Sequence, residues 1–429
     1  MTTEEKPCSL TRKAPLGSVS QFSVTGFWNR FHQTSVGSNA ACAFWSRFPY
    51  VNRLSSCQTP KYPGSLAEDS LSSATHVLQD IIRQRIEMPR TLECLLGDCQ
   101  DSLRRAESLI STASPVFLTG IGASWNAALC AGSLFQQNGR PVYMQEAGDL
   151  LHYTALPPGS VIVAVSRTGR STEIVQLLTK AEAAGACVVG ITNSADSPLA
   201  KKSKVALVIP TRLDHTISVN AYSSLLIATG ALASSVTTGF AAVAKFLFGT
   251  FEKAGQSFEL WQDQIANSGW LAPNADYYFL ARGCSLGTCH QARLMWEEAA
   301  KMPATSMSSS GFRHGPQEIV RSGMRFCLWI DQQQMREADL AVARDLRELG
   351  ASVMLIGEGL PSDAADLVCQ LPTSPPCWQF AIDMVPSQFA AERLSRLRGV
   401  DCDSFRICSY VVEDEYGLAH KKAEAPSAD

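Results

Sequence analysis

The sequence predicts an α/β protein with two units, each built on a parallel sheet covered by helices on both faces. Short apolar runs rich in β-branched residues alternate with amphipathic helical segments from about residue 115 onward. The same alternation starts again after about Trp270. A length of 429 residues, with 45% hydrophobic and 18% charged residues, allows two or three domains.

The first 64 residues differ in composition from the rest of the chain. They mix Ser, Asn, Pro and isolated aromatic residues without steady periodicity. Three interpretations remain open: a disordered extension, an upstream start-site artefact, or a transit peptide, which the early Glu4 and Glu5 disfavour. We expect no function in this segment and expect it to be dispensable. Helical periodicity begins at Ser70 and predicts helices over 70–88 and 91–111.

The first unit is predicted to occupy residues 65–255. A helix is expected at 123–139, where Gly139 marks its end, and a second at 172–185. The strand candidates are short apolar runs at 115–120, 141–147, 161–165, 186–192 and 205–210.

An uncharged stretch at 216–244 permits two interpretations, a membrane span or buried helices of a soluble core. Nine of its residues are Ser or Thr, and Gly occurs at 230 and 239, which favours the soluble core. We expect apolar helices over 217–253 and a linker over 254–275.

The second unit is predicted to occupy residues 256–429. Its helices are expected at 286–301 and 334–349, and its strand candidates at 277–283, 324–330, 351–357 and 366–372. The order of elements resembles that of the first unit, as does "LARGCSLG" when set against "LTGIGAS".

Charge and cysteine content exclude several functional classes. The net charge of −3 without a basic block does not favour a nucleic-acid partner. The fourteen cysteines contain no C-x-x-C motif and no Cys/His cluster with zinc spacing. They indicate reduced, mostly buried thiols in a cytoplasmic protein, with no metal site.

Two strand ends of the first unit are polar and built from small residues. They are "GIGASWN" (120–126) and "SRTGRST" (166–172), and each leads directly into a helix. Ligands bind at the carboxyl ends of parallel strands, and a helix N-terminus offers unpaired N–H groups to an anion. The composition is typical of a phosphate site without a lysine. An ordinary turn with a Ser/Thr helix cap is the alternative.

The second unit offers a carboxylate and an imidazole near each other in the chain. Glu297 and Glu298 are adjacent on a helix, so only one can face a cleft. His314 lies in the loop "GFRHGP". Such residues are commonly solvated or buried in a core, but they are also suited to moving protons on a sugar.

These motifs in this order resemble a family, the double sugar-isomerase (SIS) domain proteins, and within it the isomerase half of glucosamine-6-phosphate synthases. The similarity covers about Leu78 to Glu415. The resemblance implies two flavodoxin-like αβα units, an active site without cofactor, and a homodimer with a shared site. The motifs are "GIGAS", "AVSRTGRSTE", "GITN", "EEAAKMPA", "GFRHGP" and "RLRGVDCDSFR".

The resemblance also implies roles for individual residues. Glu298 corresponds to the family's proton-transferring glutamate, which acts between C1 and C2 of the sugar. His314 corresponds to the histidine that helps to open the sugar ring and comes from the neighbouring subunit. The positions implied to bind the sugar phosphate are Ser124, Ser166, Arg167, Thr168 and Ser171.

The chain departs from the family's pattern at several positions. The lysine that forms a Schiff base with the keto sugar corresponds to Tyr410 or Ser409 here, and neither is an amine. A further family lysine corresponds to Asn220, and a threonine to Ala123. We expect no glutamine hydrolysis by this chain, because Thr2 stands where the nucleophilic cysteine would follow Met1.

Two functions follow from the sequence. The first is an enzyme that isomerises a hexose 6-phosphate or an amino-hexose 6-phosphate between aldose and ketose, with release or addition of ammonia. The second is a regulatory module that binds a sugar phosphate without turnover. The missing lysine favours the second, whereas Glu298 and His314 favour the first.

Overall fold

The computed structural model describes residues 74–415, 417 and 418, all within one compact unit, Leu66–Asp429. The segment 1–64 lies outside the described residues, so its expected lack of function stays a prediction. The proposed domain boundaries at 65, 255 and 256 also stay predictions.

The first sheet has five parallel strands in the order β2-β1-β3-β4-β5. Its central strand β3 is buried along its whole length, because helices cover both faces of the sheet. The strands are β1 (Val116–Thr119), β2 (Tyr143–Met144), β3 (Val161–Val165), β4 (Cys187–Thr192) and β5 (Val205–Val208).

Alternate residues of these strands point to two different helical layers. Ile162 of β3 packs in a cluster with residues of α5 (Ala147–Tyr153), α6 (Thr172–Ala183) and α7 (Pro198–Lys202). Val161 and Val163 pack on the opposite face. That face is covered by α2 (His76–Leu96), α3 (Gln100–Thr112), α4 (Ala123–Gln137) and α8 (Asn220–Thr237).

The second sheet has the order β10-β9-β8-β6-β7 and is also parallel throughout. Counted from its own first strand, each sheet has the order 2-1-3-4-5, which is the flavodoxin order. The predicted fold class is therefore confirmed. The strands are β6 (Tyr277–Ala281), β7 (Thr305–Ser308), β8 (Arg325–Trp329), β9 (Ser352–Glu358) and β10 (Leu367–Leu371).

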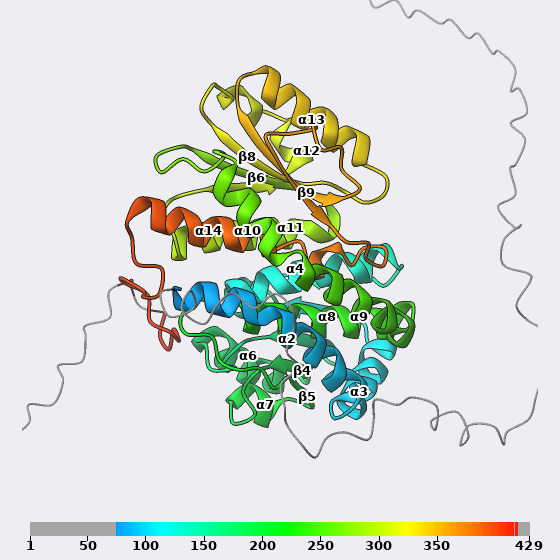
Figure 1. Cartoon of the computed structure of the whole chain (residues 1–429). Coiled ribbons are helices and arrows are strands. Elements are labelled where there is room, and N and C mark those ends of the chain that lie inside the picture. The colour runs from blue at the N-terminus through cyan, green and yellow to red at the C-terminus, as the bar shows by residue number, and fades with distance from the viewer. Residues whose placement is uncertain (1–73, 416, 419–429) are drawn as a thin grey trace, which may run out of the picture. The chain divides into compact units, whose positions relative to one another are not determined.

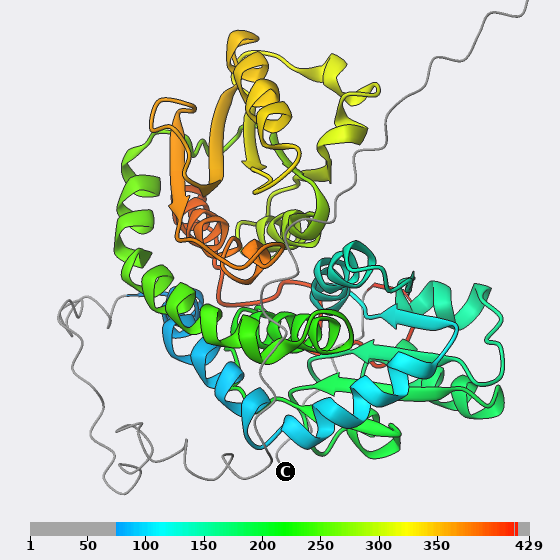
Figure 2. The ribbon, with the colours of Figure 1, turned by 90° about the vertical axis from the view of Figure 1, so that its right-hand side faces the viewer.

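Helices also cover both faces of the second sheet (Figure 1). The helix α11 (Leu286–Glu298) packs on β6 and β7 and contacts α4 of the first unit, which joins the two sheets through a helical layer (Figure 2). The other helical elements are α9 (Phe240–Gln256), α10 (Phe258–Asn267), α12 (Ser309–Phe312), α13 (Arg336–Glu348), α14 (Val385–Arg398), η2 (Gly283–Ser285), η3 (Pro316–Ile319) and η4 (Gln379–Ala381).

The uncharged stretch 216–244 forms α8 and the start of α9. The helix α8 is buried on nearly every side, between α2, α3 and α4. The Thr229 hydroxyl donates to the Leu225 carbonyl at 2.7 Å, which satisfies a polar group inside the core. Within the described part of the chain, no helix combines the length and apolar character needed to cross a bilayer.

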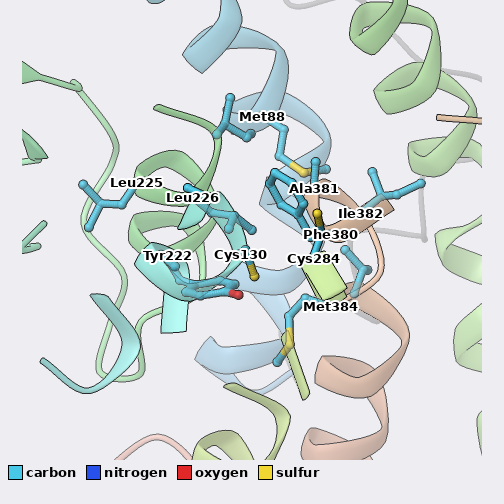
Figure 3. Packing of buried hydrophobic residues seen from close by; sticks show 14 of the residues in the cluster. Met88, Cys130, Tyr222, Leu225, Leu226, Cys284, Phe380, Ala381, Ile382 and Met384 are labelled. Carbon is cyan, nitrogen blue, oxygen red and sulfur yellow. The ribbon is translucent and has the colours of Figure 1, made fainter. Parts of the chain in front are cut away.

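The core contains side chains from both units. Figure 3 shows Cys130 of α4 and Tyr222 of α8 close together, with Cys284 and Phe380 from the second unit nearby. These side chains are at most 7% exposed. Burial of apolar area on this scale is the main stabilising contribution to the fold.

The prediction of a linker over 254–275 is wrong, because most of this range is helical. Helix α9 continues to Gln256, and α10 occupies Phe258–Asn267. Phe258, Trp261 and Ile265 form an apolar stripe with helical spacing, and α10 packs against α14. The prediction failed because Gln, Asn and Ser interrupt this stripe.

Several elements were not predicted, and three of them show why. β7 consists of "TSMS" and lacks the apolar run that marks a strand, so its pairing with β6 defines it. α5 is only seven residues long. α14 has Gln388 and Glu392 among its buried residues, so it shows little amphipathic contrast.

Candidate functional site

A cavity of about 260 Å³ opens at the carboxyl ends of β1 and β3. Four parts of the chain line it: the β1–α4 turn, the β3–α6 loop, the end of α11 and a C-terminal segment at 405–412. Six of the seven predicted site residues line this cavity: Ser124, Ser166, Arg167, Thr168, Ser171 and Glu298. The structure thus brings together residues that are up to 174 positions apart in the sequence, from Ser124 to Glu298.

The β1–α4 turn brings a helix N-terminus to the cavity. A Cβ atom on Gly120 would lie 2.8 Å from the backbone of Ser124, so the strand can approach the helix closely only with glycine here. Ser124 is the second residue of α4 and is 8% exposed. Its backbone N–H donates to the Ile121 carbonyl at 3.2 Å.

The β3–α6 loop is preorganised by its own hydroxyl groups. Ser166 Oγ accepts a hydrogen bond from the Gly169 N–H at 3.1 Å, and Thr168 Oγ1 accepts one from the Arg170 N–H at 3.3 Å. Both hydroxyl protons can then donate to a ligand. Gly169 has a φ of 60°, and a Cβ there would collide with the Ser197 side chain.

Ser171 bears on one part of the alternative interpretation of this loop, the helix cap. It stands at the N-cap of α6, yet in the described part of the chain its hydroxyl makes no capping hydrogen bond. The interpretation as an ordinary Ser/Thr cap is therefore not supported. The hydroxyl lines the cavity beside the N-terminus of a 12-residue helix, where a negative charge is stabilised.

Arg167 connects the loop to the C-terminal segment. Its Nη2 donates to the Tyr410 carbonyl at 2.9 Å, and its guanidinium lies 4.0 Å from the centre of the Tyr410 ring. Its Nη1 donates to the Thr216 carbonyl at 3.4 Å. The guanidinium thus has two carbonyl partners and a cation–π contact, and its charge still acts on the cavity.

Glu298 and its neighbour Glu297 have different environments. Glu297 is bound to Arg293 on the solvent side of α11, with 3.1 Å between Nη1 and Oε1. Glu298 ends the helix and faces the cavity. Burial raises the pKa of the Glu298 carboxyl to about 7, although the positive charges of Arg167 and Lys301 oppose this shift.

Lys301 connects the end of α11 to the C-terminal segment by hydrogen bonds. Its Nζ donates to the Glu298 carbonyl at 2.5 Å and to the Ser404 carbonyl at 2.7 Å. Burial lowers the pKa of Lys301. The residue has a φ of 50°, a backbone conformation that is uncommon outside glycine.

His314 is described and exposed, but it does not line this cavity. It follows α12 in a short turn, where its backbone N–H donates to the Gly311 carbonyl at 3.0 Å. Within one chain, the structure therefore separates the imidazole from Glu298. A shared site in a dimer, as the resemblance implies, stays a prediction.

The C-terminal segment contributes lining residues that the sequence reasoning did not assign to the site. The Val412 carbonyl accepts a hydrogen bond from the Thr172 N–H at 3.1 Å, at the first turn of α6. Tyr410 and Ser409, one of which corresponds to the family's lysine, both line the cavity. The motif "RLRGVDCDSFR", which matches the family's closing segment, is the sequence signal that could have placed these residues at the site. Ser218 and Glu173 also line the cavity. Glu173 ends the motif "AVSRTGRSTE" but was not assigned to the site, and no sequence signal identified Ser218.

Among the described residues, no group of three or more His, Cys, Asp or Glu side chains is arranged to hold a metal ion. The cavity's polar groups are hydroxyls, carboxylates, a guanidinium and backbone N–H groups. Groups of this kind suit a phosphorylated, hydroxyl-rich ligand.

Comparison with known proteins identifies the first unit. A family model described as "SIS domain" matches residues 109–235. This stretch is a SIS domain. It contains the β1–α4 turn, the β3–α6 loop and most of α8.

The SIS domain lies within a longer region of similarity. Glutamine–fructose-6-phosphate aminotransferase (isomerizing) of Pyrococcus horikoshii is 24% identical over 336 residues, 75% of this chain and 56% of that protein. Glutamine–fructose-6-phosphate aminotransferase (isomerizing) 1 of Arabidopsis thaliana is 24% identical over 332 residues, 74% of this chain and 48% of that protein. The chain spans about half the length of the curated relatives it matches.

Solved structures show the same fold. The C-terminal domain of glucosamine-fructose-6-phosphate aminotransferase from Francisella tularensis has a TM-score of 0.69 at 18% identity, covering 77% of this chain and 98% of that one. Tagatose-6-phosphate ketose/aldose isomerase from Escherichia coli has a TM-score of 0.69 at 20% identity, covering 81% of this chain and 99% of that one. The predicted resemblance is therefore confirmed: the chain has a SIS fold and is homologous to the isomerase half of the aminotransferases.

Proposed function

We propose that this chain acts on a hexose 6-phosphate or an amino-hexose 6-phosphate and interconverts its aldose and ketose forms, with release or addition of ammonia. One observation supports this most directly. A carboxyl group whose pKa is raised to about 7 faces the same cavity as the hydroxyl-rich N-terminus of α6. An anion site and a proton-transfer group thus stand within reach of one small ligand.

The phosphate is assigned to the β3–α6 loop. Ser166, Thr168 and Ser171 present hydroxyl groups beside the first turn of α6. Hydrogen bonds to a charged phosphate are stronger than those between neutral groups, so this end of the ligand would fix its orientation. The carbon chain would then extend toward Glu298, with Ser124 as a further donor to its hydroxyl groups.

The proton transfer is assigned to Glu298. As a carboxylate, it takes a proton from C2 of an aldose while the O1 oxygen gains one, which gives an enediol or enolamine. The same group then returns the proton to C1. A pKa near 7 suits both halves of this step, because the group must accept and donate a proton at neutral pH.

Ammonia release needs no amine on the protein. When the substrate bears an amino group at C2, proton return to C1 gives an imine at C2. Water adds to that imine, and ammonia leaves from the ketose phosphate. This route fits a chain in which Tyr410 and Ser409, rather than a lysine, line the cavity. We assign ring opening to His314 of a neighbouring subunit, because within one chain it lies outside the cavity lining.

A second candidate is a module that binds a sugar phosphate without turnover. The observation that favours it is that Arg167 contacts Tyr410, and that either Tyr410 or Ser409 stands where the family has its lysine. The chain resembles, among solved structures, a putative sugar binding protein from Salmonella typhimurium at 19% identity and a TM-score of 0.59, which shows the fold alone.

A panel of hexose 6-phosphates and 2-amino-hexose 6-phosphates separates the two candidates. The enzyme is expected to release ammonia and form ketose phosphate from at least one member, with Glu298→Gln as the inactive control. Saturable binding of a panel member without product would support the module. If no member of the panel were bound or converted, both candidates would be contradicted.

A further inference from the structure

A second cavity lies at the carboxyl ends of β6 and β8, which is the position in the second sheet that corresponds to the sugar site in the first. It has a volume of about 520 Å³. Two cysteines line it, Cys284 from η2 and Cys377 from the loop before η4. Gln137, the last residue of α4, also lines it.

One amide group holds both thiols. Gln137 Nε2 donates to Cys284 Sγ at 3.6 Å, and the Cys377 thiol donates to Gln137 Oε1 at 2.5 Å. A third contact runs from Gln333 Nε2 to Cys377 Sγ at 3.4 Å. Residues 93 positions apart in the sequence are thereby held as a thiol pair.

The two thiols differ in exposure and acidity. Cys377 is half-buried and faces the cavity, whereas Cys284 is 7% exposed. The Cys284 thiol stabilises the Cys377 thiolate by a hydrogen bond and so lowers the pKa of Cys377 to about 7. The same contact and burial raise the pKa of Cys284. Cys377 has a φ of 64°, so the surrounding structure holds its backbone in an uncommon conformation.

We propose that Cys377 and Cys284 form a peroxide-reactive dithiol that closes into a disulfide across this second cavity. The Cys377 thiolate attacks one oxygen of a peroxide, the O–O bond breaks, and the leaving hydroxide takes a proton to become water. Cys377 is then a sulfenic acid. The Cys284 sulfur attacks the sulfenic sulfur, the S–O bond breaks, and the hydroxyl leaves with the Cys284 proton as a second water. Two thiols and one peroxide give a disulfide and two waters.

This dithiol is separate from the sugar site, so it can be tested independently of the proposed function. Gln137 ends α4, whose first turn contains Ser124. Cys284 lies two residues before the start of α11, which ends at Glu298. Helices of 13 and 15 residues therefore separate the two sites, roughly 20 Å at 1.5 Å per residue.

The test uses the folded full-length chain treated with hydrogen peroxide. Remaining thiols are then alkylated in denaturant, and the chain is cleaved with trypsin without reduction. We expect the peptides 283–293 and 348–393 to appear linked, two hydrogens lighter than their sum, with fragmentation that places the bond at Cys284 and Cys377. Before oxidation, iodoacetamide should modify Cys377 at pH 7 about tenfold or more faster than Cys408, because burial raises the pKa of Cys408.

Three variants make the result specific. Cys284→Ser should leave Cys377 as a sulfenic acid that a dimedone probe captures, and Cys377→Ser should abolish the link. Cys187→Ser, which removes a half-buried thiol on β4, should leave the link intact. Unlinked peptides in the wild type after peroxide, or a link that persists in Cys377→Ser, would overturn the proposal. If the serine variants do not fold, the linked peptides and the alkylation rates of the wild type still decide it.

Discussion

Adjacent residues on one helix can have unrelated chemistry, and Glu297 and Glu298 show this. Their side chains leave α11 about 100° apart, because an α-helix has roughly 3.6 residues per turn. Glu297 meets Arg293 and solvent, whereas Glu298 meets the cavity and the charges of Arg167 and Lys301. The sequence selected Glu298 over Glu297 only through the resemblance, in which Glu298 corresponds to the family's glutamate. The structure supports that choice by burial and position.

Glu298→Gln should remove the base while keeping side-chain volume and hydrogen bonding. We expect kcat to fall by about 10²–10⁴ with KM little changed, because the proton transfer is lost while the phosphate contacts remain. Steady-state kinetics on the best substrate of the panel measures this. Glu297→Gln is the matched control and should lower kcat far less than Glu298→Gln does. If the two variants ranked the other way, the catalytic assignment would be wrong by one residue.

The raised pKa of Glu298 also predicts a pH-dependent stability difference. The folded-state pKa of about 7 lies above the ordinary value of 4.5, so the folded chain holds this proton more tightly. The associated stability is present below pH 4.5 and is lost as the pH rises through 7. Glu298→Gln should therefore melt at a higher temperature than the wild type at pH 8 and show a smaller difference at pH 5. Scanning calorimetry at both pH values tests this, and an equal difference at both would contradict it.

The phosphate assignment is tested at Ser166 and Thr168. Replacing both with Ala removes two hydroxyl donors to the phosphate. Affinity for the phosphorylated sugar should weaken by about 1–3 kcal/mol, the range for lost charge-assisted hydrogen bonds. Affinity for the unphosphorylated sugar serves as the control and should change little. Unchanged binding of the sugar phosphate by a folded double variant, measured by calorimetry, would remove the loop from the site.

At the scale of elements, the N-terminus of α8 shows how a departure from the family is accommodated. Asn220 stands where the family has a lysine, and it is fully buried. Its Nδ2 donates to Asp214 Oδ1 at 2.8 Å and to the Asp80 carbonyl at 2.9 Å. Asp214 also accepts the backbone N–H groups of Val219, Asn220 and Ala221. One carboxylate thus caps α8 and helps to fix it against α2.

Asp214→Ala should destabilise the fold by about 3 kcal/mol. The change leaves three buried N–H groups and the Asn220 amide without this acceptor, and it removes an ionic partner of Arg83. Urea unfolding measures the loss. Asp101→Ala is the control, since Asp101 is 89% exposed in the first turn of α3, and it should change stability by less than about 0.5 kcal/mol. Equal effects of both substitutions would show that Asp214 does not act as a buried cap.

Strands and helices differed in how well the sequence predicted them. The buried strands β3, β4 and β9 were predicted correctly, because apolar β-branched runs mark a strand covered on both faces. β7 and α14 were missed, because their polar residues find partners that are distant in sequence. Ser306 Oγ of β7, for example, lies 2.7 Å from His290 Nδ1 of α11. Such contacts leave no local pattern.

At the scale of the whole molecule, the proposed shared site makes a quantitative prediction. Chains with Glu298→Gln and chains with His314→Ala should each be nearly inactive alone. A heterodimer purified through two different tags combines an intact Glu298 from one chain with an intact His314 from the other. It should regain about half of the wild-type activity, since a two-fold dimer then has one complete site of two. Activity no higher than that of the separate variants would mean that His314 does not complete a neighbour's site.

The sequence by itself determined the fold class and the two strand-end loops, and its motifs, through the resemblance to the SIS family, singled out Ser124, Ser166, Thr168, Ser171 and Glu298 for test. These features depend on local periodicity, on Gly and hydroxyl residues at turns, and on motif spacing, all of which are written along the chain. Only the tertiary structure decided that the C-terminal segment lines the cavity, that the Ser171 hydroxyl does not cap its helix, and that Gln137 joins two distant cysteines. Each of these rests on contacts between residues far apart in sequence, which no local pattern encodes.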